Sequence, residues 1–320
     1  MKDSTLNGSK KLSIILLSYY SESRLKDAYQ KIEEKMNFEK IDFELIIIDD
    51  GSKDNSFNIA LELENKHSKV KAYQLSRNFT THYAKFAGFS KCTGNCVVSV
   101  PDDLQLPLSV IVDMYRSWEK GAKIVIPHRA TRTDSIKEKF FSELYYKIMN
   151  SISAVKFPPG GADGFLADRE IIDILNNQIR PTNTSTIVEV LRLGFDPVLI
   201  PYERVKSKNK SRWTFRKKLK LFKESFLSAS TWPIKMITFT GIASFLMSLL
   251  VMLTVVFLKF QNISSMGGVK VPGWASILVI VSMFSGLILL SLGIIAEYIW
   301  QIYEEVKDRP AYIIKNKAND

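Results

Sequence analysis

Hydrophobic and polar positions alternate in short blocks over residues 11 to about 205, and the blocks predict strands and helices in turn. Apolar runs rich in β-branched residues predict buried strands at Leu12–Leu17, Phe43–Ile48, Val70–Leu75, Cys96–Val100 and Lys123–Ile126. Apolar residues at helical spacing predict helices between them, at Leu25–Met36, Phe57–Asn65, Thr81–Cys92 and Val110–Glu119. Strands that alternate with helices predict βαβ units, so we expect an α/β domain with a mostly parallel sheet.

Two long apolar runs follow this domain. Met236–Leu258 and Val271–Ala296 contain no charged residue. About 20 apolar residues cross the hydrocarbon core as a helix, so the sequence predicts two transmembrane helices, at about 236–258 and 274–297, with a short external loop between them. A pair of helices buried in a soluble core is the alternative, which the length of both runs and their lack of charge oppose.

The chain of 320 residues carries a net charge of +11, with 24% charged and 46% hydrophobic residues. Such a charge fits nucleic acid, an anionic membrane surface or an anionic substrate. Basic residues concentrate in Tyr202–Lys223, just before the first apolar run, which favours the membrane surface. No nucleic-acid-binding fold pattern is present, so we expect no nucleic-acid partner.

Charge and apolar pattern together predict an integral protein of the inner or plasma membrane. The flanks outside the two runs are basic, and the positive-inside rule then places the α/β domain and both termini in the cytoplasm. Thr214–Ser230 has the pattern of a basic amphipathic helix in the headgroup plane, or of a helix packed on the soluble domain. We expect a tail at 1–10, the domain at 11–212, juxtamembrane helices at 213–232, the two spans within 233–300 and a cytosolic tail at 301–320.

Other chemistries find no support in the sequence. Cys92 and Cys96 are the 2 cysteines of the chain, so there is no disulfide framework, and they lack the partners of a zinc site. The Gly-x-Gly-x-x-Gly and P-loop patterns do not occur, which argues against a Rossmann dehydrogenase and a P-loop NTPase.

Pairs of acidic residues follow two of the predicted strands. Asp49 and Asp50 come after the second strand, and Asp102 and Asp103 after the fourth. Ligands of open α/β sheets bind beyond the carboxyl ends of the strands, so we expect both pairs at one edge. Like charges so placed need compensation, which a divalent metal with a diphosphate provides. An ordinary polar turn is the alternative for either pair taken alone.

Three motifs carry a family resemblance: IDDGSKDNS (48–56), LSRNFTTHYAKFAGF (75–89) and PDDLQLP (101–107). Their order and spacing resemble glycosyltransferase family 2, most of all its polyprenyl-phosphate branch of dolichyl-phosphate mannosyltransferases and bactoprenol glucosyltransferases. The closing AEYIWQIYEEVKDRPAYII (296–314) is similar to the end of that branch. The resemblance implies a GT-A fold, a nucleotide-sugar donor, Mg²⁺ or Mn²⁺, a lipid-phosphate acceptor and inversion at the anomeric carbon.

The resemblance also implies roles for residues around the donor. Tyr20 and Glu22 lie in the segment that begins the nucleotide pocket, where Ser18 and Ser21 replace the usual Pro and Asn. It assigns contacts with base and ribose to Asp49 and Asp50. The matches to the family's Arg-Asn pair, for which structural caps are the alternative, are Arg77 and Asn78.

PDDLQLP departs from the family's usual Asp-x-Asp-Leu-Gln-Asp-Pro, because Pro101 and Leu106 stand where the family has Asp. Metal ligation is therefore expected of Asp103 and Gln105, with Asp102 as a substitute, and Asp103 is also expected to be catalytic. The departure puts metal dependence in question, although diphosphate oxygens supply further ligands.

Basic residues supply the expected acceptor side. Arg129 and Arg132 match a basic pair of the family, so we expect them to bind the acceptor phosphate and to be catalytic, with a solvated basic loop as the alternative. The family's basic-Ser-basic-aromatic stretch is matched by Arg204, Lys210, Ser211 and Arg212, for which we expect a mobile lid over donor and acceptor phosphates.

The expected function is inverting transfer of one sugar, from a UDP-sugar by preference, to undecaprenyl or another polyprenyl phosphate at the cytosolic membrane face. One alternative is a GDP-mannose enzyme like dolichyl-phosphate mannosyltransferase. Another is a catalytically silent membrane scaffold, which Pro101 and Leu106 support. A polysaccharide synthase needs more than two spans. Two isolated spans also favour a homo-oligomer, and the sequence does not identify the sugar.

Overall fold

The computed structural model describes residues 10–129, 158, 162, 164–182, 185–203, 236–237, 239–243, 246–247, 250, 273–307 and 309–315. The chain divides into two compact units. One comprises Met1–Ala229 together with Pro310–Asp320, and the other comprises Ser230–Arg309.

The described residues of the first unit form a 7-stranded sheet with the order β3-β2-β1-β4-β6-β5-β7. Its strands are β1 (Lys11–Ser18), β2 (Asp42–Asp49), β3 (Val70–Gln74), β4 (Cys96–Pro101), β5 (Ile124–Arg129), β6 (Leu166–Asp168) and β7 (Val198–Tyr202). All pairings are parallel except those of β6, which runs antiparallel to β4 and β5. The predicted α/β class with a mostly parallel sheet is confirmed.

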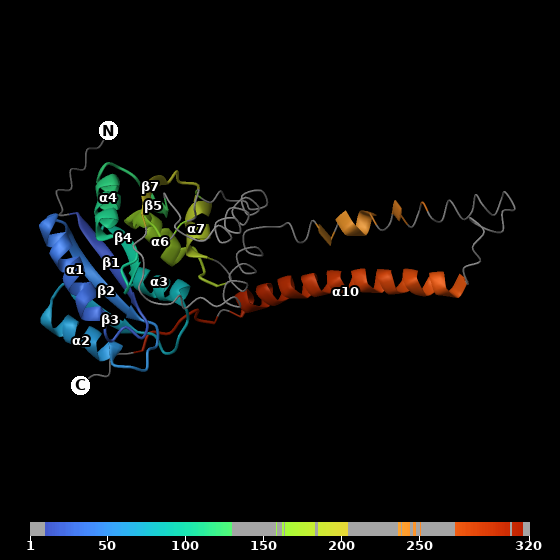
Figure 1. Ribbon diagram of the computed structural model, residues 1–320, viewed down its shortest axis with the longest axis horizontal. Helices are drawn as coiled ribbons and strands as arrows, with labels where there is room; N and C mark the ends of the chain where they lie inside the picture. Colours follow the sequence, from blue (N-terminus) through green and yellow to red (C-terminus); the bar gives the residue numbers. More distant parts are fainter. Residues whose placement is uncertain are drawn as a thin grey trace. The chain divides into compact units, whose positions relative to one another are not determined.

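Helices cover both faces of this sheet (Figure 1). On one face lie α1 (Leu25–Phe38), α2 (Ser56–Lys66) and α4 (Leu108–Glu119). On the other lie α3 (Thr81–Phe89), α6 (Arg169–Asn177) and α7 (Thr186–Arg192). The result is a three-layer arrangement in which central strands are buried from both sides, which explains their near-continuous apolar sequences.

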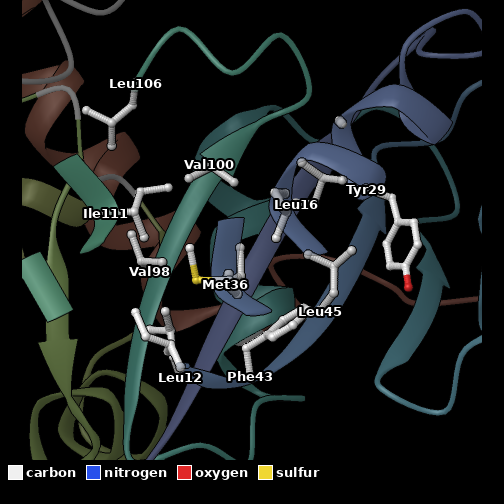
Figure 2. Packing of buried hydrophobic residues seen from close by; sticks show 14 of the residues in the cluster. Leu12, Leu16, Tyr29, Met36, Phe43, Leu45, Val98, Val100, Leu106 and Ile111 are labelled. Carbon is white, nitrogen blue, oxygen red and sulfur yellow. The ribbon is translucent and has the colours of Figure 1, made fainter. Parts of the chain in front are cut away.

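The core follows from the alternation of side chains along the strands. Leu12 and Leu16 of β1 point into the cluster under α1 and α4, whereas Ile15 and Leu17 point into the cluster under α3 and α6. Figure 2 shows the first cluster, with side chains from β1, β2 and β4 against those of α1 and α4. Helix α1 presents Leu25, Ala28, Tyr29, Ile32 and Met36 to it, at the three-and-four spacing of an amphipathic helix.

All the strands and helices expected up to residue 126 are present, with ends shifted by at most a few residues. Helices α6 and α7 and strand β7 lie beyond the last predicted strand and have no counterpart among the predictions, and neither does the short strand β6. Three residues are too few to establish a period of two, and its antiparallel direction depends on partners distant in the chain.

The strand order reverses between β1 and β4. The chain runs outward from β1 through β2 to β3 and then returns to pair β4 on the other side of β1. Loops that leave in opposite directions open a crevice at such a point, and ligands of α/β sheets bind there. The loops after β1, β2 and β4 are therefore the place to look for a binding site.

The second unit contains α10 (Gly273–Val306), which includes the range 274–297 expected as a helix. Among the described residues, none of the helices has the length and apolar character that a membrane crossing requires. The other expected span, 236–258, falls largely outside the described residues, and the amphipathic segment 214–230 falls wholly outside them.

Candidate active site

The carboxyl ends of β1, β2 and β4 meet at one edge of the sheet. Asp49 at the end of β2 lies opposite Ser18, and Pro101 at the end of β4 lies opposite Leu17. The turn after β1 joins the two acidic loops, because Tyr20 N donates to Ser52 Oγ (2.9 Å) and the Ser21 hydroxyl donates to Asp102. Both acidic pairs therefore lie at the same edge, as the sequence predicted.

Asp49 is fully buried and organises the loop after β2. Its carboxylate accepts hydrogen bonds from Ser52 N (3.0 Å), from the Ser52 hydroxyl (2.5 Å) and from Gln74 Nε2 (2.9 Å). Since Ser52 Oγ in turn accepts from Tyr20 N, Asp49 fixes the backbone of the turn that carries Tyr20.

Asp50 ties the same loop to the segment before α3. Its two oxygens accept from Phe79 N (2.7 Å) and Thr80 N (3.0 Å). Burial raises the pKa of Asp50 to about 6, against the lowering effect of these two amides, and the nearby Asp49 raises it further. In this structure the carboxylates predicted to contact base and ribose thus bind the protein's own loops, and they fix the position of the loop after β2.

Tyr20 and Glu22 occupy the turn after β1. Tyr20 has a left-handed backbone (φ 50°) and leaves 42% of its surface exposed, so its ring is available to a ligand. Glu22 is exposed, and its carboxylate accepts from Asn55 N at 3.3 Å. A polar, aromatic rim of this kind suits a nucleoside.

Arg77 and Asn78 are exposed in the segment held by Asp50. The guanidinium carbon of Arg77 lies 4.4 Å from the centroid of the Phe79 ring, a cation–π contact that orients it. An exposed, oriented guanidinium close to the acidic edge is suited to phosphate oxygens.

Asp102 is paired with a residue that sequence reasoning missed. Arg24 Nε donates to Asp102 Oδ2 at 2.9 Å, and Arg24 Nη2 and the Ser21 hydroxyl bind the same oxygen. The two charged side chains are only 23% and 12% exposed. Arg24 spans the switch point between β1 and β4 and neutralises Asp102, one member of the acidic pair for which the sequence analysis expected a metal.

Asp103 and Gln105 are neighbours on the loop after β4, with Gln105 Nε2 donating to Asp103 Oδ2. Asp103 is exposed, whereas Leu106 is buried in the core cluster of β1, β2 and β4. The departure at Leu106 is therefore explained by packing, because this side chain anchors the loop that presents Asp103 (Figure 2).

Arg129 ends β5, where it is the register partner of Tyr202 in β7. Its side chain lies outside the described residues, as do Arg132, Arg204, Lys210, Ser211 and Arg212. The described part of the site therefore comprises the residues that the sequence analysis expected around a donor and a metal, namely Tyr20, Glu22, Asp49, Asp50, Arg77, Asn78, Asp102, Asp103 and Gln105.

The "Glycosyl transferase family 2" model matches residues 13–194, which include the whole acidic edge. The chain belongs to glycosyltransferase family 2. It is a glycosyltransferase with a GT-A-like α/β fold.

Relatives match nearly the whole of this family 2 chain. "Uncharacterized glycosyltransferase YkcC" of Bacillus subtilis (strain 168) is 32% identical over 308 residues, covering 95% of this chain and 93% of the relative. "Bactoprenol glucosyl transferase" of Shigella phage SfII is 30% identical over 313 residues, covering 95% and 97%. Among solved structures, the "Mannosyltransferase PcManGT from Pyrobaculum calidifontis in complex with GDP-Man and Mn2+" is 14% identical with a TM-score of 0.46, covering 63% of this chain and 58% of that one.

The residues of this glycosyltransferase fit a shared cation site. Within the described parts of the chain, no group of three or more His, Cys, Asp or Glu side chains could enclose a metal. Asp103 and Gln105 still offer two adjacent hard oxygens at an exposed place, and Mg²⁺ commonly takes its remaining ligands from substrate phosphates and water. Asp102, whose charge is paired with Arg24, is the weaker candidate.

His82, another residue that the sequence analysis did not single out, joins α3 to α7. Thr186 N donates to His82 Nδ1 (3.2 Å), so Nε2 carries the proton and donates to the Pro181 carbonyl (2.7 Å). Burial lowers the pKa of His82 to about 4, although the Pro181 carbonyl opposes the shift. A neutral His82 thus fixes α7 beside the helix that follows the Arg77–Asn78 segment.

Proposed function

We propose that this glycosyltransferase transfers one sugar, with inversion, from a nucleotide diphosphate sugar to a polyprenyl phosphate. The observation that carries the proposal is the single edge at which the turn after β1 joins Asp49 to Asp102, with Asp103 and Arg77 exposed beside it. Relatives named bactoprenol glucosyl transferase, similar over nearly the whole chain, support a polyprenyl acceptor and transfer of a glucosyl group. We propose a UDP-sugar as the donor, with GDP-mannose as the alternative.

In the proposed mechanism the lipid phosphate is the nucleophile. A phosphomonoester has a second pKa near 6, so one of its oxygens is already anionic at neutral pH and needs no strong general base. The oxygen attacks the anomeric carbon, the bond to the nucleoside diphosphate breaks, and the diphosphate leaves with the electron pair. The protein has to bring two anionic groups together and stabilise the departing charge.

Residues on the donor side take up these tasks. We assign the base and ribose to the wall built by Tyr20, Asp49 and Asp50, and the diphosphate to Arg77. Asp103 and Gln105 would hold Mg²⁺ or Mn²⁺, which supplies positive charge next to the diphosphate oxygens when bound. To do so, Gln105 has to release the Asp103 carboxylate, with which it is hydrogen-bonded in the structure. We assign the acceptor phosphate to Arg129 and Arg132, and a lid to Arg204, Lys210, Ser211 and Arg212.

We further propose that the chain is an integral membrane protein with its catalytic unit and both termini in the cytoplasm. The support is the uncharged sequence at 236–258 and 271–296 together with the exposed apolar side chains of α10, among them Ile277, Leu289 and Leu292. A site close to the headgroups would allow a soluble donor to meet a lipid phosphate. Cysteine labelling of residues 1–10 and 260–270 in intact and opened cells tests this topology, and labelling of both regions from the same side would contradict it.

A donor screen tests the reaction itself. The purified full-length protein is mixed with undecaprenyl phosphate and, in turn, with radiolabelled UDP-glucose, UDP-galactose, UDP-N-acetylhexosamine and GDP-mannose, each with Mg²⁺ or Mn²⁺. We expect one donor to label the lipid extract with a product that contains a single phosphate and is labile to mild acid. Absence of labelled lipid with every donor, together with nucleotide binding, would favour the silent scaffold.

A further inference from the structure

The end of the chain pairs with the edge strand of the sheet. Ile314 forms an antiparallel bridge with Leu75, Ser76 N donates to the Ile313 carbonyl (2.8 Å), and Lys315 N donates to the Gln74 carbonyl (2.8 Å). In Figure 1 the red end of the chain lies beside β3. Segment 310–315, which follows α10 in the sequence, thus adds to a sheet edge that would otherwise present unpaired backbone groups.

Side chains fasten this segment in place. Tyr312 and Ile314 pack against the apolar cluster that contains Leu75 and Phe86, and the Tyr312 hydroxyl donates to the Phe86 carbonyl at 3.4 Å. Because the same few residues are held by backbone hydrogen bonds and by apolar packing, segment 310–315 is an integral structural part of the first unit.

Gln74 connects the segment to the donor side. Its Nε2 donates to Asp49 Oδ2 at 2.9 Å, and its Oε1 accepts from Lys315 Nζ at 3.1 Å. A lysine ammonium only donates and an ionised carboxylate only accepts, so both neighbours favour the same orientation of the Gln74 amide. The series continues from Asp49 through Ser52 to the backbone of Tyr20.

We infer that segment 310–315 is a positioning element of the donor site, acting through Gln74 on Asp49 and through Asp49 on the turn that carries Tyr20. The inference rests on the proposed nucleotide-sugar site and adds to it a dependence on the end of the chain. Gln74 and Lys315 touch no reacting atom, so we expect them to affect donor binding more than the chemical step.

The test compares Gln74→Leu, Lys315→Met and the double variant in the full-length protein. Lys315 is exposed, so its replacement leaves the core intact. Loss of one hydrogen bond changes binding by about 3- to 10-fold, so we expect the KM of the donor to rise by that factor in each single variant. We expect kcat and the KM of the acceptor to stay near those of the parent.

Two results show whether Gln74 and Lys315 affect the donor KM through one shared series of contacts or independently of each other. Because the two residues act in series, the double variant should raise the donor KM no further than Gln74→Leu alone. Matched controls are Gln30→Leu and Lys31→Met, which remove similar exposed contacts on α1 and should leave the donor KM unchanged. An unchanged donor KM in both single variants, or a full multiplication of their effects in the double variant, would overturn the inference.

Amide hydrogen exchange tests the inference independently of the proposed function, because it requires no sugar transfer. If the parent protein transfers no sugar, the proposed function fails, and the inference is then judged by exchange of the Ser52 amide, which donates to Asp49. Lys315→Met should accelerate that exchange about 3-fold or more relative to Lys31→Met. Equal exchange in the two variants would overturn the inference whatever the activity.

Discussion

Gly51 lies directly against the backbone of Arg77: a Cβ atom added to the glycine would be 2.4 Å from the Arg77 carbonyl carbon and 2.7 Å from its Cα. Gly51 follows Asp50, and Arg77 precedes the Phe79 and Thr80 amides that Asp50 binds. The contact and the hydrogen bonds together hold the loop after β2 against the segment before α3, which are the two loops on one side of the donor edge.

Gly51→Ala should therefore disrupt the site. Gly51 has a φ of +70°, which residues with a side chain rarely adopt. The added methyl group would also overlap with the backbone of Arg77, which cannot move aside without distorting the loop. We expect a loss of stability of about 2 kcal/mol or more and a large rise in the donor KM. Gly194→Ala is the control, because Gly194 has a φ of +76° with open space around it, so only about 1 kcal/mol is expected. Equal melting temperatures for the two variants would contradict the argument.

Asp103→Ala should abolish transfer while leaving the fold intact. The carboxylate is exposed, and in the described part of the chain its side-chain hydrogen bond is with Gln105, so its loss removes little packing. We expect a fall in kcat on the order of 100-fold or more. Asp113→Ala, at an exposed position of α4, controls for the loss of a surface carboxylate. Chelation should inactivate the parent and Mg²⁺ or Mn²⁺ should restore it, whereas full activity of Asp103→Ala would rule out the metal assignment.

Arg24→Met should destabilise the protein because it leaves the Asp102 carboxylate partly buried without its cation. Loss of a partner from such a pair costs about 1–3 kcal/mol. The double variant Arg24→Met with Asp102→Asn should recover part of that loss, since no unpaired charge remains. Arg116→Met breaks a more exposed pair with Glu119 and should cost less than about 1 kcal/mol. Chemical unfolding of the four proteins measures this, and equal losses for Arg24→Met and Arg116→Met would count against it.

Glu44 should give the protein an acid-sensitive component of stability. Burial alone would raise the pKa of Glu44, but hydrogen bonds from Ser13 and Thr93 and the contact with Lys11 bring it down to about 2 from 4.5. The stabilisation is thus complete above about pH 4.5 and is lost as the pH falls towards 2. It is on the order of 3 kcal/mol.

Glu44→Gln should accordingly be less stable than the parent at neutral pH, and the difference should shrink below pH 4.5. Urea titrations between pH 2.5 and 7 measure the difference. Glu62→Gln, at an exposed ion pair with Lys26, should show no comparable difference. If the difference in unfolding free energy between the parent and Glu44→Gln does not change with pH, loss of the carboxylate charge is not the cause of the lower stability.

His82 should produce a second pH effect in a higher range. Its folded pKa of about 4 lies below the ordinary value of 6.5, so the unfolded chain binds the proton more readily. The contribution of His82 to stability should fall as the pH drops from 6.5 to 4, by on the order of 3 kcal/mol, while the raised pKa of Asp50 acts in the opposite direction. The contribution of His82 is therefore taken as the difference in unfolding free energy between the parent and a His82 variant. In His82→Asn this dependence should disappear, whereas His67→Asn, at the half-exposed end of α2, should retain it. An unaltered slope in His82→Asn would refute the burial of a neutral imidazole.

Local patterning was sufficient for most of the first unit. The apolar runs at β1, β2 and β4 predicted buried strands, and the helical spacing in α1 and α4 predicted their inner faces. Because these strands are parallel, the positions of Asp49 and Asp102 after them already indicated one shared edge. The family followed from motifs in that edge, and the comparisons confirmed it.

Pairing between side chains that are distant in the chain could not be predicted from the sequence. Arg24 and Asp102 are separated by 78 positions, His82 and Thr186 by 104, and Gln74 and Lys315 by 241. None of these residues belongs to a periodic pattern that would mark it. Asp49 and Asp50 were expected to face the nucleotide, yet their carboxylates bind Ser52, Gln74, Phe79 and Thr80.

The amino-acid sequence by itself determined the order of strands and helices up to residue 126, the apolar core positions there and the gathering of acidic loops, because these depend on the local alternation of side chains. The tertiary structure alone decided which cation neutralises Asp102, which direction β6 takes and which segment closes the edge beside β3. Those outcomes depend on hydrogen bonds and packing that exist only after distant parts of the chain have come together.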